Sequence, residues 1–430
     1  MTESSTEPTI RKTTLDNGLR VVSSEIPHTR SVCISFFIGA GSRHEADEQA
    51  GIAHFVEHML FKGTESRPMP MDISGCIEGM GGMMNAHTEH EMTIFWCKAA
   101  YNCFDEVLDL MVDVMRNSVF DAGEVEKERK VVFEELSMNH DHPDYALETL
   151  VDQMLWPGHP LGRDIAGSRD SVAGITRDMM AAFVGRSYSP SNIVLSVAGN
   201  VQHKSVVQQA ELLTCGWRPQ DPLGSPVFDH TQNEPCFMNE YRRTEQTNIS
   251  LAFPGLPSDH PDRYALDLLS VVLGEGMSSR LFIEIRENLG LAYDVHSGVS
   301  HFQDTGSFVV TAGVEPARTY DALETILDQL SGIKDEVPEA EIVKAKHLAA
   351  GRLMLQMEDT RAVSGWNGAQ ELLYGRVHNA DEVVELINAT TAEDICRVAQ
   401  GILRPDRLNI AVVGPNRGRK RIERLMEQGV

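Results

Sequence analysis

The chain repeats blocks of its own sequence at half its length, and this repeat limits its possible folds more than any other feature. Each block recurs at one shared offset of 215 positions, as from 31 to 246, which is half of the 430-residue chain. One shared offset indicates duplication of a whole folding unit rather than chance similarity among apolar runs. The recurring blocks are 31–37 at 246–252, 176–190 at 391–405, and 193–199 at 408–414.

A duplication of this length predicts two homologous domains. We expect them at 1–218 and 236–430, joined by a linker at 219–235 whose prolines, glycine and polar residues are typical of a loop. Strand-like and helix-like runs mix without strict alternation, which favours an α+β fold with an antiparallel-rich sheet packed with helices in each domain. In the first domain the expected strands are 19–22, 32–38, 92–97 and 193–198, and the expected helices are 47–61, 72–80, 103–117 and 124–138.

Composition excludes several classes of function. Lys and Arg number 38 against 63 Asp and Glu, a formal net charge of -25, so we expect neither nucleic acid nor an acidic membrane as a partner. Residues 1–7 are polar and acidic, unlike a secretory signal, and no stretch is long and apolar enough to span a bilayer. The seven cysteines form no Cys-x-x-Cys pair, which is typical of free thiols, and we expect a cytoplasmic protein.

One short motif in the first domain carries metal chemistry. It reads His54-Phe-Val-Glu57-His58, and residues four apart in a helix stand one above the other, so both imidazoles can bind one metal ion. Glu57 lies beside that face and can reach a water molecule at the metal. The pattern H-x-x-E-H is a signature of zinc peptidases. The surrounding run 51–61 is apolar nearly all round, and three polar groups inside such a helix are costly unless a partner such as a metal ion satisfies them.

Two histidines leave a catalytic zinc ion one protein ligand short. The acidic helix expected at 124–138 offers candidates. Glu128 and Glu135 are seven positions apart and share a face, whereas Glu134 points about 100° away from Glu135. Spacing alone does not choose between Glu134 and Glu135.

The second domain keeps the repeat without the metal-binding groups. At the shared offset, His54, Glu57, His58 and Glu135 correspond to Leu269, Val272, Leu273 and Ala350. We therefore expect the second domain to be non-catalytic and to serve another purpose.

The sequence around these positions resembles the insulinase/pitrilysin family of zinc metallopeptidases, in the branch of mitochondrial processing peptidase and its bacterial relatives. The resemblance implies one zinc ion per chain held by His54, His58 and Glu135, with Glu128 as a supporting group. It also implies hydrolysis of a peptide bond by a water molecule that gives its proton to Glu57 as general base. The segments that carry the resemblance are 41–45, 53–64, 84–86, 128–135, 159–163 and 286–293.

The same resemblance implies how a peptide is held. Asn85 and Ala86 would position an extended substrate that pairs with an edge strand. Arg286 and Tyr293 match a pair in the family's non-catalytic half that reaches the substrate carbonyl near zinc, where both can donate hydrogen bonds to a developing oxyanion. Without the resemblance they would be a surface arginine and a core tyrosine. Because one chain carries both sets, we expect a homodimeric clamshell with two shared active sites.

The sequence thus predicts a zinc-dependent endopeptidase that hydrolyses short or unfolded peptides in an enclosed chamber. One alternative is a non-catalytic structural subunit, but relatives of that kind usually lack parts of the metal motif, which is complete here. Another is the catalytic member of a heterodimer, against which the presence of Arg286 and Tyr293 in this same chain argues. The segment 87–91 is not expected to be a second metal site, because on a strand His87 and Glu89 share one face and His90 takes the other.

Overall fold

The computed structural model describes residues 9–221, 224–229, 231–416 and 418–428. The N-terminal segment 1–7, on which the signal-peptide argument rests, lies outside the described residues, as do positions 222, 223 and 230 of the expected linker. No helix in the described part of the chain has the length and apolar character that a membrane crossing requires.

The first sheet has six strands in the order β1-β2-β6-β3-β5-β4. All neighbouring strands are antiparallel except β2 and β6, which are parallel. The central strands are buried along almost their whole length, whereas the edge strand β4 alternates exposed and half-buried residues. The strands are β1 (Thr9–Thr14), β2 (Arg20–Glu25), β3 (Ser31–Ile38), β4 (Met83–Thr88), β5 (Thr93–Ala100) and β6 (Ile193–Gly199).

The second sheet repeats this arrangement without a counterpart of β1. Its order is β7-β11-β8-β10-β9, which matches β2-β6-β3-β5-β4 position by position. The one parallel pair, β7 with β11, again occupies the equivalent place. The predicted α+β fold and its duplication are therefore present in the two sheets. The strands are β7 (Cys236–Tyr241), β8 (Thr247–Pro254), β9 (Ala292–His301), β10 (Gly306–Val314) and β11 (Asn409–Gly414).

Helices account for most of the remaining chain. Those up to residue 213 are α1 (Ile52–Leu60), α2 (Pro70–Gly79), α3 (Phe104–Asn117), α4 (Ala122–Asp141), α5 (Pro143–Leu155), α6 (Arg169–Gly174), α7 (Arg177–Ser187) and α8 (His203–Leu213). The later ones are α9 (Arg263–Gly274), α10 (Thr319–Gly332), α11 (Glu339–Gln356), α12 (Thr360–Tyr374), α13 (Ala380–Ala389), α14 (Ala392–Ile402) and α15 (Arg419–Gln428), with a π-helical turn at Phe282–Asn288.

The expected elements of the first domain agree with the observed ones to within a few residues, with one correction. The helix expected at 47–61 begins only at Ile52, because Gly51 adopts a left-handed φ of 92° that an α-helix cannot contain. The preceding Asp47–Gln49 forms a separate 3₁₀ turn.

The two compact units are not the continuous halves of the chain that the sequence predicts, because each unit contains a segment from the other half. One unit comprises the described parts of 1–136, 164–226 and 354–379, and the other those of 137–163, 227–353 and 380–430. Helix α5, from the first half, packs on β8 and β11, while α12, from the second half, packs on β2, β3 and β6. The boundaries 1–218 and 236–430 therefore do not coincide with compact units. A repeat offset reveals which helices are equivalent but not which sheet each one covers.

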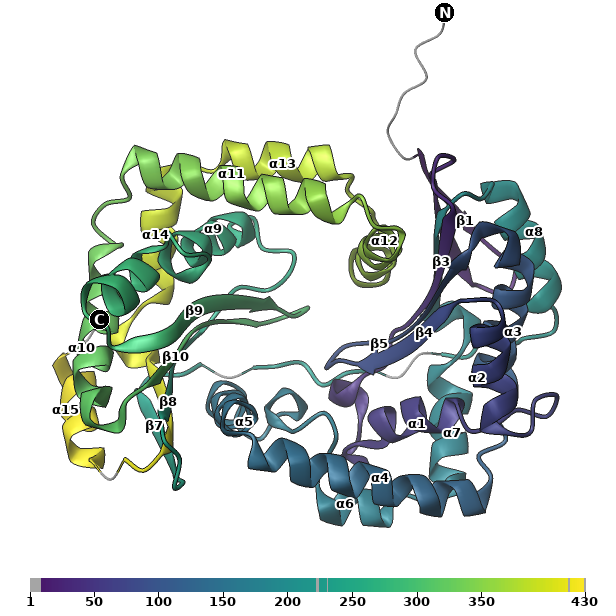
Figure 1. Ribbon diagram of the computed structural model, residues 1–430, viewed down its shortest axis with the longest axis horizontal. Helices are drawn as coiled ribbons and strands as arrows, with labels where there is room; N and C mark the ends of the chain where they lie inside the picture. Colours follow the sequence, from purple (N-terminus) through teal and green to yellow (C-terminus); the bar gives the residue numbers. More distant parts are fainter. Residues whose placement is uncertain (1–8, 222–223, 230, 417, 429–430) are drawn as a thin grey trace, which may run out of the picture. The chain divides into compact units, whose positions relative to one another are not determined.

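Helices therefore cover both faces of each sheet. In the first unit, α3 and α8 lie on one face and α12 lies on the other (Figure 1). The larger core lies on the face of α1 and α3 and includes Phe36, Phe55 and Met111. A smaller cluster, with Phe37 and Ile94 from the sheet, packs against Leu372 of α12. This arrangement buries α1 in the first core and leaves the β4 edge of the sheet accessible.

Candidate metal centre

The short helix α1 owes its start to a glycine and a buried carboxylate. A Cβ atom at Gly51 would lie 2.4 Å from the carbonyl oxygen of Ala166, so glycine is required there. Glu45 accepts hydrogen bonds from the backbone N–H groups of Gly51 and Ala53, both at 2.8 Å. A carboxylate at this end satisfies N–H groups that have no partner within the helix and interacts favourably with the helix dipole.

The polar groups of α1 are the ones that the motif singles out. Seven of the nine residues of α1 are buried, and its non-apolar members are His54, Glu57 and His58. The rings of His54 and His58 lie 4.6 Å apart between centroids, as expected for residues one turn apart. These side chains therefore need partners from other elements, since few polar groups are available on α1 itself.

Glu135 of α4 supplies the third side chain. Its Oε1 lies 3.6 Å from His54 Nε2 and its Oε2 lies 3.4 Å from His58 Nε2. Glu134, the other carboxylate that spacing left open, is exposed and is not part of this cluster. The structure therefore brings Glu135, and not Glu134, to the two histidines.

This cluster has the dimensions of a zinc site. The ligand atoms of His54, His58 and Glu135 all lie within 4.8 Å of one another, and no second such group occurs among the described residues. Ligand bonds near 2.1 Å in a tetrahedron place donor atoms about 3.4 Å apart. The two nitrogen-to-oxygen distances match that separation, so the donor set fits zinc.

The electrostatics of the cluster favour an ionised carboxylate. The hydrogen bond from His54 holds the pKa of Glu135 below its ordinary value, although burial opposes this shift. Burial disfavours the protonated form of His54, but the bond and charge of Glu135 outweigh burial and raise the pKa of this imidazole. Glu135 is therefore anionic at neutral pH, which is the state that a cation requires of a carboxylate ligand.

Glu128 contacts His58 at Nδ1, the ring nitrogen that does not face Glu135. Its Oε1 lies 2.9 Å from His58 Nδ1, and its Oε2 lies 2.6 Å from Lys62 Nζ. Burial raises the pKa of Glu128, but its bonds to His58 and Lys62 outweigh burial and keep this pKa below its ordinary value. An acceptor at Nδ1 fixes the tautomer in which Nε2 offers its lone pair to a metal. In contrast, among the described residues His54 Nδ1 has no hydrogen-bond partner.

Glu57 is held by a residue that sequence reasoning missed. The Thr88 hydroxyl, at the end of β4, donates to Glu57 Oε2 at 2.6 Å, and Glu57 is only 9% exposed. Thr88 shares a face of the strand with Ala86, so the period of two was a signal that could have found it. Lys62 was also missed, although it lies one turn beyond His58.

Asn85 and Ala86 lie on the edge strand β4. This strand pairs with β5 on one side, and no other described strand pairs with its outer edge. Asn85 Oδ1 accepts a hydrogen bond from the Ala86 backbone N–H at 2.8 Å. Both residues therefore lie where an added strand could meet the sheet.

Arg286 and Tyr293 contact each other in the second compact unit. Arg286, in the π-helical turn, donates to the Tyr293 carbonyl oxygen at 2.9 Å, and its guanidinium lies 4.6 Å from the tyrosine ring centroid. The tyrosine is 75% exposed, so it is not the core tyrosine of the alternative interpretation. The pair thus presents an exposed phenol and a guanidinium from adjoining elements.

The acidic and histidine-rich segment 87–91 makes other contacts. His87 Nε2 lies 3.4 Å from Glu89 Oε1 at the sheet surface, and His90 Nδ1 lies 2.9 Å from Ser42 Oγ. The buried Glu91 pairs with Arg43 at 2.6 Å. These groups make separate contacts and do not converge on one point.

Comparison with known proteins places the chain among peptidases. Residues 20–169 match the family described as "Insulinase (Peptidase family M16)", and residues 174–348 match "Peptidase M16 inactive domain". The chain is 34% identical over 411 residues to an uncharacterized zinc protease of Bacillus subtilis, covering 95% of this chain and 98% of that one. It is 37% identical over 419 residues to an uncharacterized zinc protease of Mycobacterium tuberculosis, covering 96% and 94%.

A solved structure shares the fold. The crystal structure of a protease from Helicobacter pylori matches with a TM-score of 0.89 and 24% identity, covering 95% of this chain and 100% of that one. The relatives match this chain over almost their full length at more than 30% identity. This chain therefore belongs to the insulinase family of peptidases, family M16.

Proposed function

We propose that this protein is a zinc-dependent endopeptidase that hydrolyses short or unfolded peptides. The observation that carries the proposal is the convergence of His54, His58 and Glu135, with donor atoms within 4.8 Å of one another, beside the carboxylate of Glu57. Membership of a peptidase family and relatives that are called zinc proteases support it.

The donor set suits a catalytic ion. His54 Nε2, His58 Nε2 and a carboxylate oxygen of Glu135 would hold one zinc ion per chain. Three protein ligands are typical of catalytic zinc, whereas structural zinc sites use four. When bound, zinc supplies Lewis-acid chemistry, which polarises the scissile carbonyl and lowers the pKa of a water molecule to about 7.

Glu57 would act first as the general base and then as the general acid. Its Oε2 accepts a hydrogen bond from the Thr88 hydroxyl at 2.6 Å. This arrangement leaves Oε1 free to accept a proton from the attacking water. The same carboxyl group then delivers that proton to the leaving amine. Because the group is nearly buried, few solvent molecules compete for this transfer.

The edge strand β4 determines the form of the substrate. We propose that Asn85 and Ala86 align an extended peptide by main-chain hydrogen bonds to the outer edge of β4. A folded protein has already satisfied its backbone groups, so short or unfolded chains are the ones able to pair in this way. Thr88 would connect this binding edge to Glu57, since it belongs to β4 and contacts the base.

Arg286 and Tyr293 are the proposed contacts to the substrate carbonyl. We propose that they donate hydrogen bonds to the substrate carbonyl, within a clamshell homodimer in which one protomer supplies the metal ligands and its partner supplies this pair. The exposed tyrosine supports this, since its hydroxyl is available for an external acceptor. All seven cysteines are free, which supports a reducing, cytoplasmic location.

A peptide-library digest read by mass spectrometry tests the function. The zinc-loaded protein should cut internal bonds of unstructured peptides, a chelator should stop cleavage, and added zinc should restore it. The Glu57→Gln variant serves as the control for contaminating proteases, since it should retain zinc and cut peptides at least about 100-fold more slowly than the wild type. Cleavage at the wild-type rate in this variant or in chelator would contradict the proposal.

A further inference from the structure

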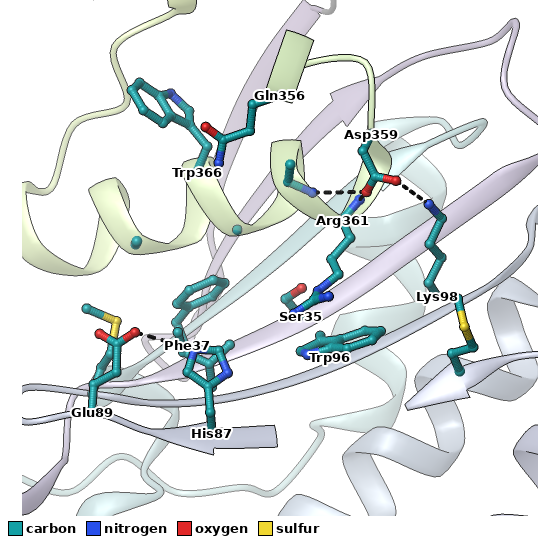
Figure 2. A pocket seen from close by; sticks show the side chains of 16 residues that line it. Ser35, Phe37, His87, Glu89, Trp96, Lys98, Gln356, Asp359, Arg361 and Trp366 are labelled. Carbon is teal, nitrogen blue, oxygen red and sulfur yellow. Dashed lines mark hydrogen bonds and ion pairs between the residues drawn. The ribbon is translucent and has the colours of Figure 1, made fainter. Parts of the chain in front are cut away.

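A cavity of about 600 Å³ lies in the first compact unit, between its sheet and α12 (Figure 2). The core that contains α1 lies on the other face of this sheet. The floor of the cavity is formed by Phe37, Ile94 and Trp96 of the sheet, and α12 lies above it. None of the candidate metal ligands lines this cavity. We call it the α12 cavity.

Helix α12 touches the sheet at one glycine and leaves open space at another. A Cβ atom at Gly368 would lie 2.1 Å from the ring of Phe37, so the helix backbone lies directly on the sheet there. A Cβ atom at Gly365, which lines the cavity, would meet nothing within 4 Å. The cavity can therefore be filled from Gly365 without disturbing the packing of α12.

Each charged group around the cavity has a partner within the lining. Lys98 Nζ lies 2.6 Å from Asp359 Oδ2, and the other oxygen of Asp359 accepts the Arg361 backbone N–H at 2.7 Å (Figure 2). The Arg361 guanidinium stacks on Trp96 at 3.9 Å from the ring centroid. Glu89 pairs with His87 at 3.4 Å. The lining therefore offers mainly apolar and aromatic surface, which suits a large apolar side chain better than a charged one.

The edge strand connects this cavity to the candidate active site. Met83 and His87 of β4 line the cavity. Met84 and Ala86, which alternate with them, pack against the core on the opposite face. Thr88 shares that opposite face and contacts Glu57. One face of β4 thus serves the metal centre, and the other faces the α12 cavity.

We propose that the α12 cavity is a specificity pocket for a large apolar or aromatic side chain of a peptide paired with β4. The proposal rests on the proposed function in taking that peptide to be the substrate. Side chains of an added strand alternate between the two faces of the sheet. Every second residue of the peptide is therefore directed to the cavity side, and the residues between them to the side of Glu57.

Peptide binding without turnover tests this pocket. In the Glu57→Gln background, fluorescein-labelled decapeptides of Ala, Ser and Thr carry one Phe that is moved along the sequence, and fluorescence anisotropy gives Kd. Gly365→Leu fills the cavity, so affinity should fall about tenfold for Phe at alternate positions, as expected for loss of an apolar burial site. The peptide without Phe should bind equally well to both proteins.

Two matched variants control for other effects of the substitution, and a third can replace it. Gly365→Ala adds little volume and should leave binding nearly unchanged. Gly401→Leu makes the same change at an exposed glycine of α14, where an added Cβ also meets open space, and should have no effect. Leucine is a better helix former than glycine, so helix α12 is not weakened by the test substitution. If Gly365→Leu still failed to fold, Ala362→Leu would fill the same cavity from another lining position.

The outcomes separate the pocket from the proposed function. Equal binding by folded Gly365→Leu and its parent at every Phe position would overturn the pocket, whether or not the wild-type protein cleaves peptides. A second peptide series carries Arg or Lys in place of Phe, and a loss of affinity confined to that series would overturn the apolar assignment. Affinity could fall for Phe at every second position while the wild-type protein cuts no peptide even with zinc. That result would support the pocket and contradict the proposed function.

Discussion

Helices α1 and α9 occupy equivalent places in the two repeats, yet their buried faces differ in chemistry. In α1 the three positions of the motif carry His54, Glu57 and His58, which need Glu135, Glu128 and Thr88 as partners. In α9 the corresponding positions carry Leu269, Val272 and Leu273, all buried and in need of no polar partner. The fold therefore accommodates an apolar helix at this place, and we propose that the polar set of α1 serves chemistry rather than folding.

The largest expected effect comes from giving α1 the residues of α9. The double variant His54→Leu/His58→Leu should lose zinc and all measurable peptidase activity, because only Glu135 of the donor set remains. Its metal-free stability should equal or exceed that of the wild type, since apolar side chains replace buried polar ones. Metal analysis measures the loss of zinc, and thermal unfolding in chelator measures the metal-free stability. Collapse of the fold in this variant would show that α1 and α9 are not equivalent.

Glu57→Gln removes the proton acceptor and keeps the metal ligands. Turnover should fall by about 10²- to 10⁴-fold, the usual contribution of a general base. Zinc content should remain that of the wild type. Wild-type kcat in this variant would remove Glu57 from the mechanism.

The second repeat is expected to act on the site of a partner protomer. Glu57→Gln chains mixed with equal Arg286→Ala chains should recover about a quarter of wild-type activity, because half of the dimers are mixed and each has one intact site. Each variant alone should remain inactive or nearly so. Native mass spectrometry verifies that mixed dimers form. Their presence without recovered activity would contradict site sharing.

A smaller effect is expected at Glu128, which has no polar counterpart in the second repeat. Glu128→Gln should weaken zinc binding by about 10- to 100-fold, because the carboxylate no longer holds His58 Nδ1. Competition with a fluorescent chelator measures the change. As a control, Glu126→Gln alters an exposed carboxylate of the same helix and should leave zinc affinity unchanged.

The last effect is confined to acidic pH and concerns the loop that precedes α1. Burial, aided by the charge of Arg43, lowers the pKa of His44 to about 4, from 6.5 in the unfolded chain. Below pH 6.5 the unfolded state takes up this proton and the folded state does not. The free energy of unfolding should therefore fall as pH drops from 6.5 towards 4, by at most about 1.4 kcal/mol per pH unit from this group. Urea unfolding of wild type and His44→Gln should show this component in the wild type alone.

Local helix geometry explains what could be predicted from the sequence. His54, Glu57 and His58 lie on one nine-residue helix, so their relation follows from 3.6 residues per turn. The repeat offset likewise predicted the two sheets, because it relates whole strands and helices. These features depend on neighbours in the chain and need no knowledge of packing.

The remaining features depend on packing between distant segments. Choosing Glu135 over Glu134 requires the rotation of α4 relative to α1, which no periodicity within α4 supplies. Thr88 and Lys62 become partners only once β4 and α4 pack beside α1. The sequence also could not predict that α5 and α12 each pack on the sheet of the other half. The two helices are equivalent in the repeat, so either sheet could accept either one.

Zinc K-edge X-ray absorption on the wild-type protein identifies the atoms that bind the metal ion. We expect one zinc ion per chain with two imidazole nitrogens and carboxylate or water oxygen at about 2.0–2.2 Å, and no sulfur. Zinc bound by cysteine sulfur, or no bound zinc after resupply, would contradict the assignment of His54, His58 and Glu135.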